Sequence, residues 1–139
     1  MTRRAVVNTD HGKLTLELYT EKMPNSCARF IEMAQRGDYN KGNIVWHRVE
    51  DWVIQTGQGI PGYKPIKLEI DRSLKHTKGA VGMARTNDPH SASTQFYIVK
   101  RDSTFLDGNY AMFGMVVDGQ PVMDTIRQGE RVVSVKMLD

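Results

Sequence analysis

Hydrophobic residues occur along this chain mostly in short runs, some of which alternate with polar residues. Residues 14–19 show the clearest two-residue period, and residues 5–7 form a short apolar run before them. Alternation places every second side chain on one face of a β-strand. With a turn at residues 10–12 between them, the two segments predict an opening β-hairpin.

One stretch after this hairpin repeats its apolar residues with the period of a helix. Between Cys27 and Ala34 they recur at i, i+3, i+4 and i+7, which places them on one helical face. Pro24 suits the first turn of a helix, and Gly37 is placed to end it. We predict a helix here whose apolar face packs in the core.

The segment 45–57 contains two apolar runs on either side of an acidic pair at residues 50–51. We interpret it as two strands joined by a two-residue turn at the acidic pair. The face that results would carry two opposed pairs: Arg48 with Val53, and Trp46 with Gln55. An arginine, an amide, an aliphatic side chain and an aromatic ring together are unusual for a core and typical of a binding surface.

The remaining pattern predicts more short strands, a polar loop at residues 85–94, and a short helix at residues 121–127 closed by Gly129. Gly82, inside a strand, indicates close backbone approach or a bend. The strands are expected at residues 67–70, 80–84, 95–99, 111–117 and 131–138. About eight short strands with regular turn signals favour a closed or nearly closed β-barrel in one domain, residues 1–139.

Composition fits a globular domain, since 40% hydrophobic and 25% charged residues argue against disorder. The lone cysteine, Cys27, excludes an internal disulfide framework and favours a reducing compartment. Neither a signal peptide nor a membrane-spanning stretch is evident. We expect a soluble, cytoplasmic monomer with no membrane partner.

The net charge of +3 and the pI near 9.1 raise the question of nucleic-acid binding. The basic residues are scattered, in pairs at most, whereas a nucleic-acid surface concentrates them on one face or helix. We therefore expect no nucleic-acid partner, and salt-dependent retention on DNA is the test of that alternative.

Residue patterns for the commoner kinds of catalysis are missing. The four histidines are dispersed, so no metal is expected. Glycine-rich phosphate loops are absent, and no cofactor is expected. Ser91, Ser93 and Thr94 lie together without a nucleophile-elbow pattern, which favours a hydrogen-bonded loop.

Three segments, in the same order, resemble the cyclophilin family. Residues 46–49 with 53–57 are similar to its Phe-His-Arg signature and the Gln-Gly run that follows. Residues 75–84 with 91–98 resemble its central stretch, and residues 105–114 resemble its Leu-Asp-Gly and Phe-Gly run. The rest of the chain fits from the opening hairpin to the last strand, and the pattern is most like small, single-domain bacterial members.

The resemblance implies a mostly β fold, a closed eight-stranded antiparallel β-barrel capped by two α-helices. It also implies peptidyl-prolyl cis/trans isomerase activity, with proline-containing peptides and unfolded or folding proteins as partners. Rotation about a peptide bond has a barrier of about 18–20 kcal/mol because resonance must be broken. That reaction requires no nucleophile, metal or cofactor.

The family's functional residues map onto this chain by position. Arg48 matches the catalytic arginine, whose guanidinium can donate to the twisted amide nitrogen. Gln55 matches the glutamine that holds the substrate backbone, and Ala84 and Gln95 match further peptide contacts. The proline pocket would consist of Trp52, Val53, Tyr97, Phe105, Leu106 and Tyr110. Without the resemblance, we would assign Trp52, Tyr97, Phe105 and Leu106 to the core. We interpret His47, on the opposite face from Arg48, as a satisfied internal histidine and not as a catalytic residue.

The chain also departs from the family pattern. The turn after Arg48 is one residue shorter, the loop at residues 57–65 lacks the family's glycine-rich segment, and the loop at residues 87–90 is slightly longer. Phe105 replaces a tryptophan, which predicts weak binding of cyclosporin. Tyrosines at 97 and 110 replace phenylalanine and histidine, and their hydroxyls need partners or water.

Two functions remain open at this point. Arg48 and Gln55 favour an isomerase, whereas the shortened groove loop leaves room for a module that binds proline-containing segments without turnover.

Overall fold

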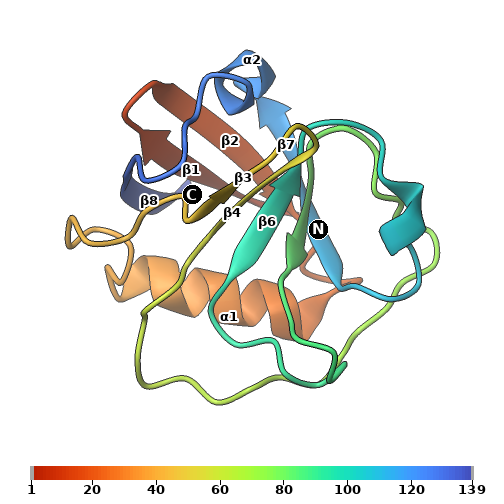
Figure 1. The fold of residues 1–139 in the computed structure, drawn as a ribbon. Coiled ribbons are helices and arrows are strands. Elements are labelled where there is room, and N and C mark those ends of the chain that lie inside the picture. Colours follow the sequence, from red (N-terminus) through yellow and green to blue (C-terminus); the bar gives the residue numbers. More distant parts are fainter. Residues whose placement is uncertain (1, 139) are drawn as a thin grey trace.

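A single eight-stranded sheet, curled into a half-barrel, organises the computed structural model, which describes residues 2–138 (Figure 1). Neighbouring strands are antiparallel throughout, in the order β3-β4-β6-β5-β7-β2-β1-β8. The strands are β1 (Arg3–Thr9), β2 (Gly12–Leu18), β3 (Arg48–Val49), β4 (Val53–Thr56), β5 (Ala80–Met83), β6 (Phe96–Val99), β7 (Met112–Asp118) and β8 (Val132–Leu138).

The barrel is open, and the prediction of a closed barrel is wrong. β3 and β8 form the two edges of the sheet, and between them lies a single bridge, Val45 with Arg131. Near that bridge the backbone N–H of Trp46 donates to the carbonyl of Glu130 at 2.8 Å. β3 has only two residues, so it is too short to form a ladder along the seven residues of β8.

Two helices lie at opposite ends of the half-barrel (Figure 1). α1 (Pro24–Gln35) begins and ends as predicted, with Pro24 in its first turn and Gly37 just beyond it at φ 75°. Its inner face buries Cys27 and Phe30. α2 (Gln120–Met123) is one turn, shorter than the predicted 121–127. No helix within residues 2–138 has the length and apolar character needed to cross a membrane.

The first turn of α1 is capped by a residue far along the chain. The carboxylate of Glu69 accepts hydrogen bonds from the backbone N–H groups of Asn25 and Ser26 at 3.0 and 2.7 Å, and from the Ser26 hydroxyl at 2.8 Å. The predicted strand at residues 67–70 is therefore wrong. Polar groups there bond to side chains and not to a ladder: the N–H of Leu68 donates to His90.

The core has two parts, one on each face of the sheet. Inside the half-barrel, Phe30 packs against Phe96 and Phe113 with ring centroids 5.3 and 5.7 Å apart. β5 and β6 are buried on both faces, so a second apolar cluster forms outside them. Its buried members are Val53, Ala80, Tyr97, Val99, Leu106 and Met112. This outer cluster supports the candidate site.

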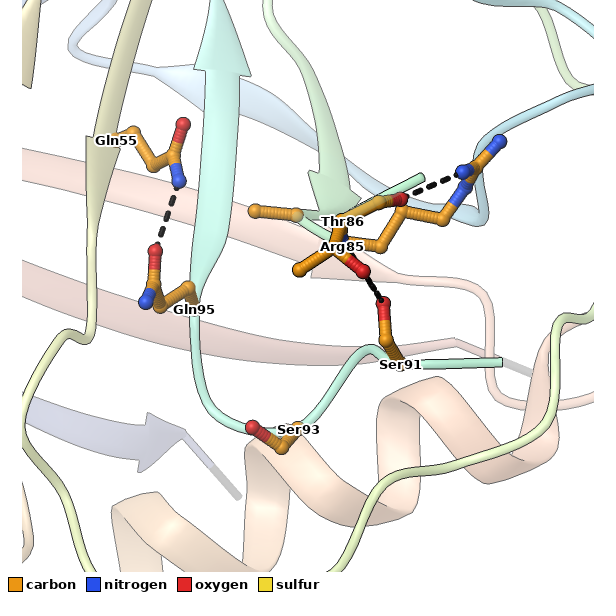
Figure 2. Close-up of a pocket in the computed structure, with 7 residues that line it drawn as sticks. Gln55, Arg85, Thr86, Ser91, Ser93 and Gln95 are labelled. Carbon is orange, nitrogen blue, oxygen red and sulfur yellow. Dashed lines mark hydrogen bonds between the residues drawn. The ribbon is translucent and has the colours of Figure 1, made fainter. Parts of the chain in front are cut away.

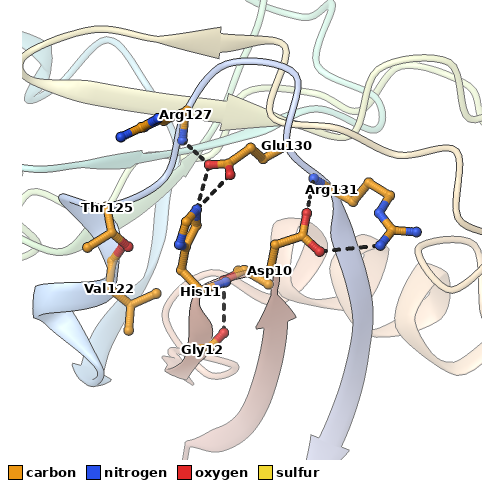
Figure 3. A network of polar contacts seen from close by, with 9 residues as sticks. Asp10, His11, Gly12, Val122, Thr125, Arg127, Glu130 and Arg131 are labelled. Atoms are coloured by element: carbon orange, nitrogen blue, oxygen red, sulfur yellow. Dashed lines mark hydrogen bonds and ion pairs between the residues drawn. The ribbon is translucent and has the colours of Figure 1, made fainter.

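The opening hairpin forms as predicted, and its turn is tied to the segment that leads into β8 (Figure 3). The ring of His11 lies 2.8 and 2.6 Å from the two carboxylate oxygens of Glu130. Asp10 accepts hydrogen bonds from the backbone and the guanidinium of Arg131 at 3.1 and 3.4 Å. The first and last strands are thus joined at this end.

Candidate functional site

The hairpin predicted around Arg48 is present, with its turn one residue later than expected. Arg48 pairs with Gln55, and the turn falls at residues 51–52. Because the pairing moves by two residues, the alternation of faces is kept, and Arg48, Val53 and Gln55 still share the outer face.

Trp46 does not join this face, and its predicted pairing with Gln55 is wrong. Its side chain is fully buried in the inner core, with its ring centroid 6.3 Å from that of Phe96. The reason is that β3 begins only at Arg48, so the strand alternation does not extend back to residue 46.

A cavity of about 160 Å³ opens on the outer face of β4, β5 and β6, and we call it the apolar cavity because six of its nine lining residues are aliphatic or aromatic. Buried side chains of Val53, Tyr97 and Leu106 form part of its wall, and the rings of Tyr97 and Tyr110 meet edge to face at 6.1 Å. Eight of the ten residues transferred from the family line it: Arg48, Trp52, Val53, Gln55, Ala84, Tyr97, Leu106 and Tyr110. The ninth lining residue, Arg85, was not anticipated.

Phe105 lies outside this cavity. It is 68% exposed, and its ring packs on the outer side of the site against Trp52, with centroids 5.1 Å apart. The 3-10 turn η1 (Thr104–Leu106) directs Leu106 inward and leaves Phe105 at the rim.

A second cavity, of about 140 Å³, adjoins the first, and all of its lining residues except Ala84 have polar side chains (Figure 2). The two share Gln55, Ala84 and Arg85, and the second adds Thr86, Ser91, Ser93 and Gln95. The Ser91 hydroxyl accepts from the N–H of Thr86 at 2.9 Å and donates to the Asp88 carbonyl at 2.7 Å, so this loop is hydrogen-bonded as predicted.

Arg48 is held on three sides at the rim of the apolar cavity. Its Nη1 donates to Oε1 of Gln55 at 3.4 Å, and its guanidinium carbon lies 5.5 Å from the ring centroid of Trp52. Its Nε bonds to the carboxylate of Glu50. Nη2 has no hydrogen bond to any residue between 2 and 138. Sequence reasoning missed the role of Glu50, although it lies two residues from Arg48.

A line of amides connects Arg48 with the second cavity. Nε2 of Gln55 donates to Oε1 of Gln95 at 2.9 Å, and Figure 2 shows the two amides facing each other. His47 lies beyond them, and its pKa is lowered by burial and by the charge of Arg48, against a hydrogen bond with Gln95. Its Nδ1 is buried with no partner in the described part of the chain, so the prediction of a fully satisfied histidine is wrong.

Arg85 braces the wall between the two cavities. Its Nε and Nη2 donate to the carbonyl of Asn109 at 3.1 and 2.9 Å, and its Nη1 donates to the carbonyl of Thr86 at 2.8 Å. The guanidinium lies 4.3 Å from the ring centroid of Tyr110, and Figure 2 shows it directed away from the second cavity. Arg85 directly follows Ala84, a predicted peptide contact, and this adjacency could have indicated that Arg85 lines the site.

Fold and site together define an antiparallel half-barrel with an apolar cavity, a polar cavity and an arginine on its outer face. Amides and a guanidinium beside an apolar slot suit a segment of peptide carrying a compact apolar side chain. Within residues 2–138, no group of three or more His, Cys, Asp or Glu side chains is arranged to hold a metal ion.

Comparison with known proteins places the chain in a family. Residues 4–138 match the family described as "Cyclophilin type peptidyl-prolyl cis-trans isomerase/CLD". Peptidyl-prolyl cis-trans isomerase B of Escherichia coli is 37% identical over 135 residues, which cover 86% of this chain and 81% of that protein. The isomerase cyp18 of Streptomyces antibioticus is 37% identical over 136 residues, 87% of this chain and 81% of that protein. The chain therefore belongs to the cyclophilin-type peptidyl-prolyl cis-trans isomerases, and its enzyme class is prolyl isomerase.

Solved structures agree with the fold. A cyclophilin-type isomerase of Cryptosporidium parvum superposes with a TM-score of 0.88 at 23% identity, covering 100% of this chain and 99% of that one. A second structure of that protein, determined in the presence of the dipeptide Ala-Pro, has a TM-score of 0.87 over 98% of this chain and 99% of that one, also at 23% identity.

Proposed function

We propose that Arg48 is the catalytic residue of this isomerase. The single observation that carries the proposal is the position of its guanidinium: beside the apolar cavity, fixed by Gln55 and Trp52, with Nη2 unbonded within residues 2–138. An N–H donor at that place can reach the nitrogen of a prolyl amide whose ring lies in the cavity.

Such a donor favours the transition state over both ground states. A planar amide nitrogen shares its lone pair with the carbonyl, whereas a twisted amide frees that lone pair to accept a hydrogen bond. An interaction made only in the twisted state lowers the barrier without tightening either planar state. Each tenfold acceleration requires about 1.4 kcal/mol of such selective stabilisation.

The two cavities divide the work of holding the substrate. We assign the proline ring to the apolar cavity, where Val53, Tyr97 and Leu106 form the wall, and the substrate backbone to Gln55. The residues before proline would extend toward the polar cavity beside Gln95. With the proline ring and the preceding residues held in different cavities, one side of the prolyl bond can stay fixed while the other side rotates.

We also propose that the clients are proline-containing segments of unfolded or folding proteins. Unaided isomerisation of an Xaa-Pro bond takes tens to hundreds of seconds, which is slow enough to limit folding. An open cavity on the outer face of the sheet is accessible to an extended chain.

The test is the cis/trans exchange rate of a short Xaa-Pro peptide, measured by NMR with the intact protein and with Arg48→Ala. We expect acceleration by the intact protein and a loss of about 10²- to 10³-fold in the variant. Arg4→Ala, on β1 and far from the site, is the matched control for loss of an arginine and keeps full activity.

A second candidate is a module that binds proline-containing peptides without turnover. It is favoured by the ion pair between Arg48 and Glu50, which occupies part of the guanidinium. In the same experiment, peptide chemical-shift changes without faster exchange would support this candidate and contradict the isomerase mechanism.

A further inference from the structure

Behind the wall of the apolar cavity, three polar side chains form a hydrogen-bonded chain, in which His76 and Tyr97 are buried and Asp107 is half-buried. Nδ1 of His76 is 2.7 Å from a carboxylate oxygen of Asp107, and Nε2 of His76 is 2.7 Å from the hydroxyl of Tyr97. The same carboxylate oxygen accepts the backbone N–H of His76 at 2.8 Å. His76 is 1% exposed and Tyr97 5% exposed, so water does not substitute for the bond between these two side chains.

The donors and acceptors of these three side chains fit one protonation state of His76, the neutral ring. A carboxylate only accepts, so Nδ1 of His76 carries the ring proton, and Nε2 accepts the hydroxyl proton of Tyr97. Burial lowers the pKa of His76, against the opposing effect of Asp107, and burial raises the pKa of Tyr97. With His76 neutral, the hydrogen bonds from His76 to Asp107 and from Tyr97 to His76 both have a donor and an acceptor.

The ring of Tyr97 reaches His76 only because residue 82 is glycine. A Cβ atom at Gly82 would lie 2.2 Å from the Tyr97 hydroxyl oxygen and 2.3 Å from the ring carbon that bears it. Such contacts are far inside van der Waals distance. The sequence predicted close backbone approach or a bend at Gly82, and the structure shows that the Tyr97 side chain, a wall of the apolar cavity, lies against the backbone there.

We propose that His76 and Asp107 are positioning residues that fix the Tyr97 ring, and that acidification releases this wall of the proline cavity. Asp107 directly follows Leu106, so the hydrogen bonds from Asp107 through His76 to Tyr97 connect two wall residues, Leu106 and Tyr97, behind the cavity. The proposal rests on the proposed function and adds to it a means by which pH regulates the same site.

Protonation of His76 reverses the hydrogen bond to Tyr97. With protons on both nitrogens, the ring donates to the hydroxyl oxygen, and the hydroxyl proton needs another acceptor. The ionisable groups around the chain are Asp107 beside His76, Lys75 near Asp107, and Tyr110 and Arg85 near Tyr97. Lys75 and Arg85 are cationic and cannot accept the hydroxyl proton. Within residues 2–138, the hydroxyl of Tyr97 has no hydrogen bond to Tyr110, whose ring meets it edge to face.

The first test is the pH profile of the peptide exchange rate for the intact protein and for Tyr97→Phe. We expect the intact protein to lose activity as the pH falls from about 7.5 to about 5. Tyr97→Phe is expected to be about five- to tenfold slower at pH 7.5, the effect of one buried hydrogen bond, and to have no acid limb. Tyr110→Phe, which removes a hydroxyl from the same cavity, is the matched control and keeps the acid limb. Parallel profiles for the intact protein and Tyr97→Phe would overturn the proposal.

Two further measurements do not depend on turnover. Long-range ¹H–¹⁵N spectra report the tautomer of His76, and a proton on Nε2 at pH 7.5 would overturn the proposal even in an active enzyme. Titration with a proline peptide should show affinity falling at acid pH, and Gly82→Ala should weaken binding more than about tenfold by displacing the ring. If the intact protein does not accelerate exchange, the proposed function fails, while the tautomer and the binding titration still decide this inference.

Discussion

Single residues decide the charge that a substrate would meet at the site. Arg48 and Glu50 form an ion pair at the rim, with 43% and 47% of their side chains exposed. Exposed ion pairs contribute little to stability. We therefore expect Glu50 to affect the catalytic rate and not stability. A carboxylate beside the Arg48 guanidinium cancels part of the guanidinium's electrostatic field at the amide nitrogen of the substrate.

Replacing Glu50 by glutamine should raise the exchange rate. We expect an increase in kcat/KM of about two- to threefold, the factor given by a few tenths of a kcal/mol. The measurement is peptide exchange at low and high salt, with Asp51→Asn in the same turn as the control that leaves the rate unchanged. A tenfold fall in Glu50→Gln would instead show that the carboxylate aims Arg48.

The sequence predicts these residues unevenly. Arg48 and Gln55 could be found because both lie in one short motif, and alternation places them on one face of a hairpin. The contact of His76 with Tyr97 could not be found, because it joins positions 21 residues apart through the pairing of β5 with β6. The sequence indicated only that the Tyr97 hydroxyl needs a partner. Weak cyclosporin binding, argued from Phe105, stays a prediction.

At the scale of elements, the irregular segment between β4 and β5 has a structural role. It carries Glu69 to the first turn of α1, where the residue before the helix, Met23, provides no side-chain cap. Periodicity predicted α1 well, because the repeat of apolar residues that indicates a helix lies within the helix itself. It misassigned residues 67–70, because a carboxylate capping a helix 43 residues away leaves no periodic signal.

Removing this cap should destabilise the fold. We expect Glu69→Ala to lower the free energy of unfolding by about 1–2 kcal/mol, since it removes the two backbone cap hydrogen bonds, the bond from the Ser26 hydroxyl, and a negative charge at a helix N-terminus. Urea unfolding with an unchanged m-value is the measurement. Glu32→Ala, on the exposed part of the same helix, is the control, and an equal loss there would contradict the capping role.

At the scale of the whole molecule, burial of two histidines makes stability depend on pH. His76 and His47 both have a lowered pKa in the folded chain, chiefly because burial disfavours their charged form. The unfolded chain therefore binds more protons than the folded chain when the pH falls below the ordinary histidine pKa. The stabilisation is complete above that pKa and is lost as the pH falls through the folded values.

The midpoint of urea unfolding should accordingly decrease between about pH 7.5 and pH 5. Asp107 adds a second loss at lower pH: burial would raise its pKa, but the backbone and ring N–H groups of His76 outweigh burial and lower it. His47→Gln should retain only the part of the slope due to His76. A midpoint that is constant or rises on acidification would contradict this assignment.

Turn signals and alternation predicted about eight strands, and the family resemblance implied their antiparallel pairing, but the expected closure of the barrel is wrong. Whether the edges meet depends on the length of β3, which has only two residues and begins after Trp46, a residue buried in the inner core. A hydrophobic pattern shows that a residue is apolar and not which of two cores receives it.

The pairing of β1 with β8 affects how the protein folds during its synthesis. β1 lies between β2, its neighbour in the chain, and β8, in a ladder that runs from Arg4 with Leu138 to Thr9 with Val132. During synthesis, β1 is made before β8, so the edge of β1 that pairs with β8 stays unpaired until β8 has been made. Contacts so distant in sequence slow folding and leave an edge open to aggregation. The nascent chain of this prolyl isomerase is therefore itself a candidate for protection on the ribosome.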